Sequence, residues 1–174
     1  MPVTDFFAIL DMPAGCQLDR QLLDAQYRKR QALWHPDRFV NAPEADKRQA
    51  LQQTSLLNDA YNILKHPLRR AEHLLDLRLC ESGEVAVGKL EPEFLLQQLQ
   101  WREELEQLDA HRNEPALAGL RQRVEAALAH HWQLIEADIQ RHDWCAARLS
   151  LQKLQFLNKL QEELNHREAS WLEN

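Results

Sequence analysis

The segment YRKRQALWHPDRF, residues 27–39, carries three consecutive cationic side chains and, after four intervening residues, a His-Pro-Asp triplet. Apolar residues recur at helical spacing before the triplet, which predicts a helix over about residues 20–34. Asp19 is placed to cap the start of this helix, because its carboxylate can accept from the first free backbone N–H groups. Pro36 ends the helix, since a residue that precedes proline is disfavoured in the α conformation. The triplet is therefore expected in a short loop that follows a basic helix.

The chain outside this segment has the composition of a helical protein. Only four of its 174 residues are glycine, while residues with unbranched side chains, which lose little freedom in a helix, are abundant. Further helices are predicted over about residues 4–10, 44–65, 67–78, 92–111, 113–140 and 143–164. Residues 80–92 hold two glycines and a proline and indicate a connection. We predict an all-α protein with domains at 1–78 and 92–174, joined by a linker at 79–91, and with antiparallel helices in the second domain.

Composition also excludes several classes of protein. The net charge is −6, and residues 79–174 carry all of the net negative charge, which argues against general nucleic-acid binding. No apolar stretch approaches the roughly 20 residues of a membrane span, and no basic residue precedes the first apolar run as in a signal peptide. We therefore expect a cytoplasmic protein that does not bind membranes. Cys16, Cys80 and Cys145 are widely spaced, so neither a disulfide framework nor a zinc knuckle is expected.

The triplet admits three interpretations: a catalytic pair, half of a metal site, or a docking loop. A catalytic pair needs a nucleophile nearby, and Pro36 is expected to splay the His35 and Asp37 side chains apart. The sequence contains no HExxH, no GxSxG and no glycine-rich phosphate loop, so catalytic residues, a metal and a cofactor are not expected.

A proline-stiffened loop loses little entropy on docking, and Arg28, Lys29 and Arg38 add cations for an acidic partner. From the residues alone, a docking loop and an ordinary exposed polar loop remain equally open.

A second surface follows from helical angles. At about 100° per residue, the helix from Pro92 has a core face made of Phe94, Trp101, Leu105 and Leu108. Leu95, Leu96, Leu99 and Glu103 fall away from that face. In the last helix, Leu149, Phe156 and Leu160 fall away from the face formed by Ala147, Leu151, Leu154 and Leu157. If the two helices are neighbours, these groups form one apolar patch suited to a partner. For any single residue, packing against the first domain or a wider core is an equally good interpretation.

Three segments resemble one family. YRKRQALWHPDRF resembles the second helix and signature loop of a J-domain, and LNDAYNILKHPLRRAEHLL, residues 57–75, resembles the third helix running into the HPLxRAEYLL pattern of HscB-type co-chaperones of iron–sulfur cluster assembly. EFLLQQLQWREELEQLD, residues 93–109, resembles the start of that family's C-terminal bundle. The resemblance implies a J-domain over 1–78, a linker over 79–91, and a three-helix scaffold-binding domain over 92–174.

The resemblance further implies a co-chaperone that is not itself an enzyme. The chaperone-binding residues would be His35, Pro36, Asp37, Arg28, Lys29 and Arg38, which would stimulate ATP hydrolysis by a DnaK/HscA-class chaperone. The scaffold-binding residues would be Leu95, Leu96, Leu99, Glu103 and Phe156, which would deliver an IscU-type iron–sulfur scaffold protein to it. The alternative is a J-domain helical adaptor for another client.

Four positions depart from the family pattern. His73 stands where a tyrosine is usual after RAE, and Arg30 stands where an aliphatic residue is more common. Gln100 and Gln107 replace two carboxylates of the family's scaffold-binding region. We therefore expect a weaker acidic contribution to scaffold binding, with apolar contacts dominant.

Overall fold

The computed structural model describes residues 3–84, 88–111 and 113–172, and every regular element in these residues is a helix. The chain divides into two compact units, residues 1–83 and 84–174. The all-α prediction, with a helical front module and a helical bundle behind it, is confirmed. The last helix of the first unit extends to Ser82, past residue 78, where the sequence placed the end of the first domain.

The first unit contains α1, α2, a 3₁₀ turn η1, α3 and α4. Their bounds are Phe6–Ile9, Arg20–Trp34, Pro36–Phe39, Glu44–Leu64 and Pro67–Ser82. The expected cap at Asp19 is present, because its carboxylate accepts from the N–H groups of Gln21 and Leu22, and the Asp5 carboxylate likewise accepts from the Ala8 N–H at the start of α1. These bonds satisfy donors that have no partner within the first turn of a helix, and they fix where α2 begins.

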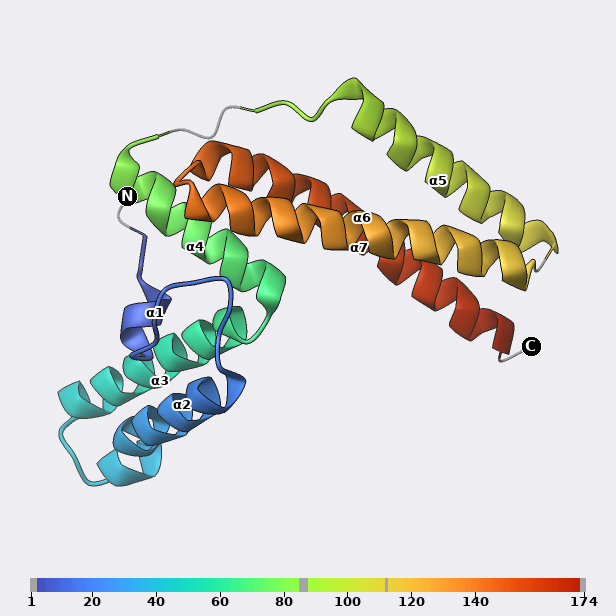
Figure 1. The fold of residues 1–174 in the computed structure, drawn as a ribbon. Coiled ribbons are helices and arrows are strands. Elements are labelled where there is room, and N and C mark those ends of the chain that lie inside the picture. The colour runs from blue at the N-terminus through green and yellow to red at the C-terminus, as the bar shows by residue number, and fades with distance from the viewer. Residues whose placement is uncertain (1–2, 85–87, 112, 173–174) are drawn as a thin grey trace. The chain divides into compact units, whose positions relative to one another are not determined.

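Helices α2 and α3 form a hairpin, seen in blue and cyan in Figure 1. Leu23 of α2 and Leu57 of α3 are buried in it. The rings of Tyr27 and Tyr61 stack with centroids 4.3 Å apart, and the Tyr27 hydroxyl donates to Asn58 Oδ1 at 2.7 Å. The tyrosines thus fix the register of the two helices along the half-buried edge of the hairpin, which positions the loop at its far end.

His73 of α4 is buried and holds α1 in place. Its Nε2 accepts from the Phe6 backbone N–H at 3.2 Å, and its ring stacks on Phe6 and Phe7 with centroids 4.6 and 5.7 Å away. Burial lowers the pKa of His73, in keeping with a neutral ring that accepts at Nε2. The departure noted in the sequence is therefore a working part of the core of this unit.

The second unit is formed by α5, α6 and α7, with bounds Pro92–His111, Glu114–Gln140 and Trp144–Leu172. Helices α6 and α7 run antiparallel, as predicted, and α5 packs along both (Figure 1). The α6 N-cap is Asn113, and the Asp143 carboxylate accepts from the Ala146 N–H at the start of α7. The predicted core faces of α5 and α7 are buried.

Three leucines lie in other environments than the sequence indicated. Leu160 was placed on the outward patch but is fully buried, because α7 packs against α5 as well as α6 and its buried face is correspondingly broad. Leu149 is half-buried, and a methyl group at Gly88 would lie 3.1 Å from its Cδ1. Leu51 was expected on the buried stripe of α3 but is 58% exposed.

Candidate functional site

The triplet begins a tight turn immediately after α2. His35 has an extended backbone and ends α2, and Pro36 opens the 3₁₀ turn η1. This turn brings Asp37 back toward the imidazole: the Asp37 N–H donates to His35 Nδ1 at 3.3 Å, and Nδ1 lies 3.5 Å from Asp37 Oδ2. The expectation that Pro36 splays the two side chains was wrong, because the 3₁₀ geometry curls the chain back over the ring.

Both side chains of the pair face solvent, with 51% of His35 and 86% of Asp37 exposed. When Nδ1 accepts the backbone hydrogen bond, the neutral ring carries its proton on Nε2, which remains available as a donor. The loop therefore presents one imidazole donor and one carboxylate anion with defined spacing. Such an arrangement suits docking onto another protein.

The loop is braced from three sides. The Thr54 hydroxyl of α3 donates to the Trp34 carbonyl at 3.0 Å, and the Trp34 and Phe39 rings stack nearly parallel with centroids 6.0 Å apart. Arg38 Nη1 donates to the Ala32 carbonyl at 3.1 Å, which satisfies a free carbonyl at the end of α2. A loop held in this way pays little ordering entropy when it binds.

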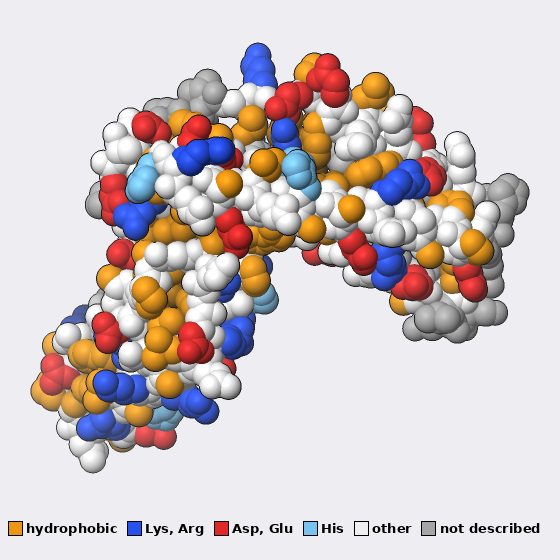
Figure 2. Space-filling model, viewed as in Figure 1, with side chains coloured by type: hydrophobic (Ala, Val, Ile, Leu, Met, Phe, Trp, Pro, Cys, Tyr) orange, Lys and Arg blue, Asp and Glu red, His pale blue; other side chains and the backbone are white. Residues whose placement is uncertain are grey.

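The predicted basic residues Arg28, Lys29 and Arg38 are all exposed. Arg28 Nε donates to the Asp24 carbonyl one turn earlier, so its aliphatic stem lies along α2. Lys and Arg side chains gather over the helical hairpin of this unit in Figure 2. The structure thus brings the six residues predicted to bind a chaperone onto α2 and the turn that follows it.

A small apolar hollow next to the triplet was not predicted. It has a volume of about 310 Å³ and is lined by Pro36, Phe39, Val40, Lys47 and Leu51. The signal for it was present in the sequence, because about 100° per residue places Leu51 about 120° from Leu57 around α3.

The second predicted surface is present in part, because Leu160 is buried and Leu149 is half-buried. Leu95, Leu96 and Leu99 on α5 are 45%, 56% and 54% exposed, and Phe156 on α7 is 37% exposed. The Phe156 ring packs edge-on against Phe94, with centroids 6.4 Å apart, so it lies next to the first turn of α5. We call Leu95, Leu96, Leu99 and Phe156 the leucine patch. Large apolar side chains gathered on two adjoining helices are typical of an interaction surface.

The polar surroundings of the leucine patch agree with the sequence. Glu103 is exposed on α5, as are the amides of Gln100 and Gln107. Arg102 Nη2 lies 3.8 Å from Glu163 Oε1 and joins α5 to α7. The patch therefore has a carboxylate at Glu103, while the two glutamines contribute no charge.

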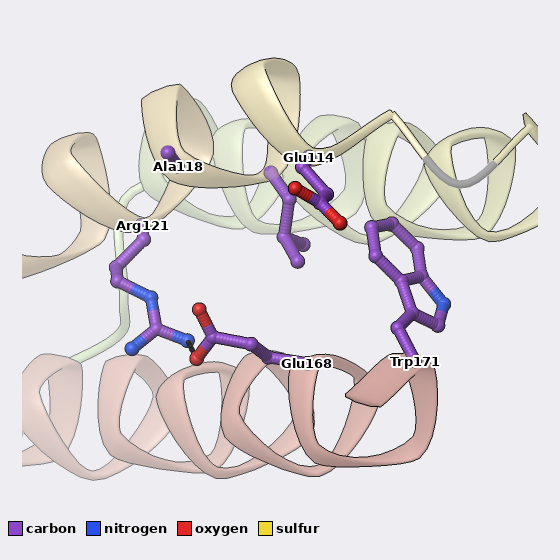
Figure 3. A pocket seen from close by; sticks show the side chains of 6 residues that line it. Glu114, Ala118, Arg121, Glu168 and Trp171 are labelled. Carbon is purple, nitrogen blue, oxygen red and sulfur yellow. Dashed lines mark hydrogen bonds and ion pairs between the residues drawn. The ribbon is translucent and has the colours of Figure 1, made fainter. Parts of the chain in front are cut away.

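A pocket of about 300 Å³ lies near the N-terminus of α6, between α6 and α7. Figure 3 shows Arg121 and Glu168 facing each other across it, with an ion pair at 2.5 Å and Trp171 at one end. None of the residues singled out in the sequence lines this pocket. Arg121 and Glu168 pair with each other, and the carboxylate of Glu114 is the other charged group that lines the pocket.

Residues 3–84, 88–111 and 113–172 offer neither a metal site nor a membrane span. In this part of the chain, no three His, Cys, Asp or Glu side chains are grouped so that they could hold a metal ion. The same residues contain no helix with the length and apolar character needed to cross a bilayer.

Both a family model and a curated relative match this chain. Residues 90–165 match the family model described as the HSCB C-terminal oligomerisation domain. A co-chaperone protein HscB homolog of Vibrio cholerae serotype O1 is 37% identical over 169 residues, covering 97% of this chain and 99% of that protein.

Two solved structures share the fold. The chaperone HscB from Vibrio cholerae has a TM-score of 0.81 and 36% identity, with 96% of this chain and 99% of that chain covered. The human co-chaperone protein HscB has a TM-score of 0.81 at 22% identity, with 97% and 84% covered, and supports the fold alone. An exposed His-Pro-Asp turn after a basic helix, a three-helix bundle behind it, and full-length similarity to these relatives show that the chain belongs to the HscB family of J-domain co-chaperones.

Proposed function

We propose that this protein stimulates ATP hydrolysis by a DnaK/HscA-class chaperone and delivers an IscU-type iron–sulfur scaffold protein to it. In this proposal, the partner chaperone supplies both the nucleotide pocket and the catalytic groups. Its first unit acts on the nucleotide site of the partner, and its second unit holds the client. The family membership supports this division of labour, and so do the two separate surfaces.

The observation that carries the proposal is the braced, exposed turn at His35–Asp37. A docking loop has to project polar groups that its own fold does not use, and the imidazole Nε2 and the Asp37 carboxylate meet this requirement. The exposed cations of α2 extend the surface, and they favour an acidic partner through complementary charge, which mainly raises the association rate.

The leucine patch supports the second half of the proposal. Covering exposed leucine and phenylalanine surface contributes about 25 cal/mol per Å² before the costs of association are subtracted. Glu103 beside the patch supplies a charge that helps to orient the client. The scaffold would therefore bind mainly through apolar contacts.

The test separates the two surfaces with one variant of each. Leu96→Ala removes an exposed patch side chain, and we expect it to weaken scaffold binding about fivefold to thirtyfold, the usual range for a central interface residue. His35→Gln should leave that affinity unchanged while it abolishes stimulation of the chaperone. Calorimetric titration of the scaffold into each variant gives the affinities, and single-turnover ATP hydrolysis gives the stimulation. Equal loss of both activities in both variants would contradict the proposed division.

A J-domain adaptor for another client is the second candidate. The neutral glutamines at positions 100 and 107 favour it, because they leave the rim of the leucine patch with less negative charge than the family pattern has. An adaptor of this kind would still stimulate the chaperone and would still need His35. It would bind no IscU-type scaffold, so the same titration distinguishes the two candidates.

A further inference from the structure

The first turn of α5 is held to the rest of its unit by four side chains, which we call the α5 clamp. Glu91 Oε2 pairs with Lys153 Nζ of α7 at 2.6 Å. The same ammonium group lies 5.7 Å from the centre of the Phe94 ring. Phe94 in turn meets the His131 ring of α6 edge-on, with centroids 6.0 Å apart. Glu91, Phe94, Lys153 and His131 thus connect all three helices at one point.

The α5 clamp lies next to the leucine patch. Phe94 directly precedes Leu95, and its ring also packs against Phe156, the one member of the patch that α7 supplies. A partner that contacts both helices needs Leu95 and Phe156 at a fixed distance from each other. The contact of Phe94 with Phe156 helps to set that distance. Phe94 therefore links the two helices that carry the patch, although it is buried itself.

Helix α5 has a reason to need such a clamp. Gln98 on its inner face is buried, and neither its amide nitrogen nor its amide oxygen has a hydrogen-bond partner among the described residues. A buried polar group without a partner destabilises the packing that buries it. The α6–α7 contact is built instead on fully buried apolar residues such as Leu120, Ile135 and Leu154. Gln98 therefore weakens the packing of α5 against the other two helices.

His131 makes the clamp sensitive to protons. Its Nδ1 is buried and has no hydrogen-bond partner in the described part of the chain. The charged and titratable groups around it are His130 on its own helix, Lys153 on α7, and Glu91 and Glu93 at the start of α5. Burial, followed by the charges of Lys153 and His130, lowers the pKa of His131. The Lys153 hydrogen bond lowers the pKa of Glu91, so that carboxylate stays charged through the range in which histidines titrate.

We propose that Glu91, Phe94, Lys153 and His131 are positioning residues for the leucine patch, and that protonation of His131 loosens the first turn of α5 and weakens scaffold binding. This rests on the proposed function of the patch. A protonated His131 is a second cation beside Lys153, and the Glu91 carboxylate is already paired with Lys153. The docked helix disfavours this state, so protons and docking of α5 oppose each other by linkage.

The experiment titrates an IscU-type scaffold protein into the full chain at pH 7.5 and pH 5.5. The wild-type affinity should fall about threefold more over this range than that of His131→Gln, which cannot be protonated there; the scaffold's own titration is common to both. At pH 7.5, Lys153→Met should weaken binding about threefold, in the range of one ion pair. Arg121→Met is the matched control: it breaks the ion pair across the pocket of Figure 3, at the other end of the unit, and should leave the affinity unchanged.

Hydrogen exchange without scaffold provides the second readout. Protection factors of the amides of residues 95–99 should fall at pH 5.5 in the wild type and much less in His131→Gln, while the amides of the α6–α7 core stay protected in both. Equal pH dependence of these protection factors in the two proteins would overturn the clamp, whatever the scaffold does. Loss of binding in Leu96→Ala without any effect of Lys153→Met or of pH would also overturn it. A clamp response in exchange with no scaffold binding by the wild type would instead overturn the proposed function.

Discussion

At the scale of single residues, two histidines of this protein lie in opposite environments. His35 is exposed and presents its imidazole to solvent, whereas His73 is buried and stabilises the fold of its own unit. The difference follows from the backbone. His35 ends a helix at a proline, and His73 lies on the inner face of α4 against Phe6 and Phe7. The same side chain thus faces solvent in one place and packs in the core in the other.

The buried imidazole predicts how stability depends on pH. Burial lowers the pKa of His73 below its ordinary value of 6.5, while the nearby carboxylates of Asp5 and Asp76 act in the opposite direction. The unfolded chain therefore binds more protons than the folded chain below pH 6.5, and the free energy of unfolding should decrease as the pH falls through that range. Urea titrations of the full chain at pH 7.5 and 5.5 measure this change.

His73→Phe is the matched variant. It keeps an aromatic ring against Phe6 but leaves the Phe6 N–H without its acceptor, so we expect a loss of about 1–3 kcal/mol at pH 7.5. Its pH dependence should be shallower than that of the wild type, because one group with a lowered pKa is gone. An equally steep dependence in both proteins would show that His73 is not linked to folding.

At the scale of elements, α2 depends on its cap. Asp19 satisfies two backbone N–H groups at the start of the helix that carries the basic face and ends at His35. Asp19→Ala should lower the free energy of unfolding by about 0.5–2 kcal/mol. Asp19→Asn keeps an accepting oxygen and should cost much less. Thermal unfolding of the two variants measures the difference, and equal losses would mean that the carboxylate acts through its charge and not through the cap.

In the second unit, a buried leucine and an exposed leucine should differ in how much their truncation destabilises the fold. Leu154 is fully buried between helices, and its truncation to alanine should cost about 2–5 kcal/mol. Leu96 is on the leucine patch, and Leu96→Ala should change stability by no more than about 0.5 kcal/mol. Urea denaturation tests both, and a large loss of stability in Leu96→Ala would place that residue in the core.

The elements also show what the sequence could and could not reveal. Caps such as Asp19 and Asn113 and the stop at Pro36 are local, and local signals predicted the helices well. The outward position of Leu95 followed from the helical period alone. The prediction that Leu160 is exposed was wrong because the helical period describes one buried face, whereas α7 is covered by two helices at once.

Tertiary contacts account for the remaining differences. The approach of Asp37 to His35 depends on a 3₁₀ turn that residue types do not specify, and the Glu91–Lys153 pair joins groups far apart in the chain. Helical periodicity contains no information about either contact. The resemblance to a family supplied the assignment of the two surfaces to particular partners, which the residues alone had left open.

At the scale of the whole molecule, the two surfaces belong to different units. The triplet and the basic face lie in residues 1–83, and the leucine patch lies in residues 84–174. Each unit thus carries one of the two exposed surfaces, so the proposed chaperone and client would bind to different parts of the chain.

The central claim is that the first unit acts on the nucleotide site of another protein and performs no chemistry itself. Single-turnover ATP hydrolysis by a DnaK/HscA-class chaperone, measured with the wild-type chain, with His35→Gln and with the chain alone, tests it most directly. The account predicts faster hydrolysis with the wild type, the basal chaperone rate with His35→Gln, and no hydrolysis by the chain alone. Full stimulation by His35→Gln, or ATP hydrolysis without the chaperone, would contradict it.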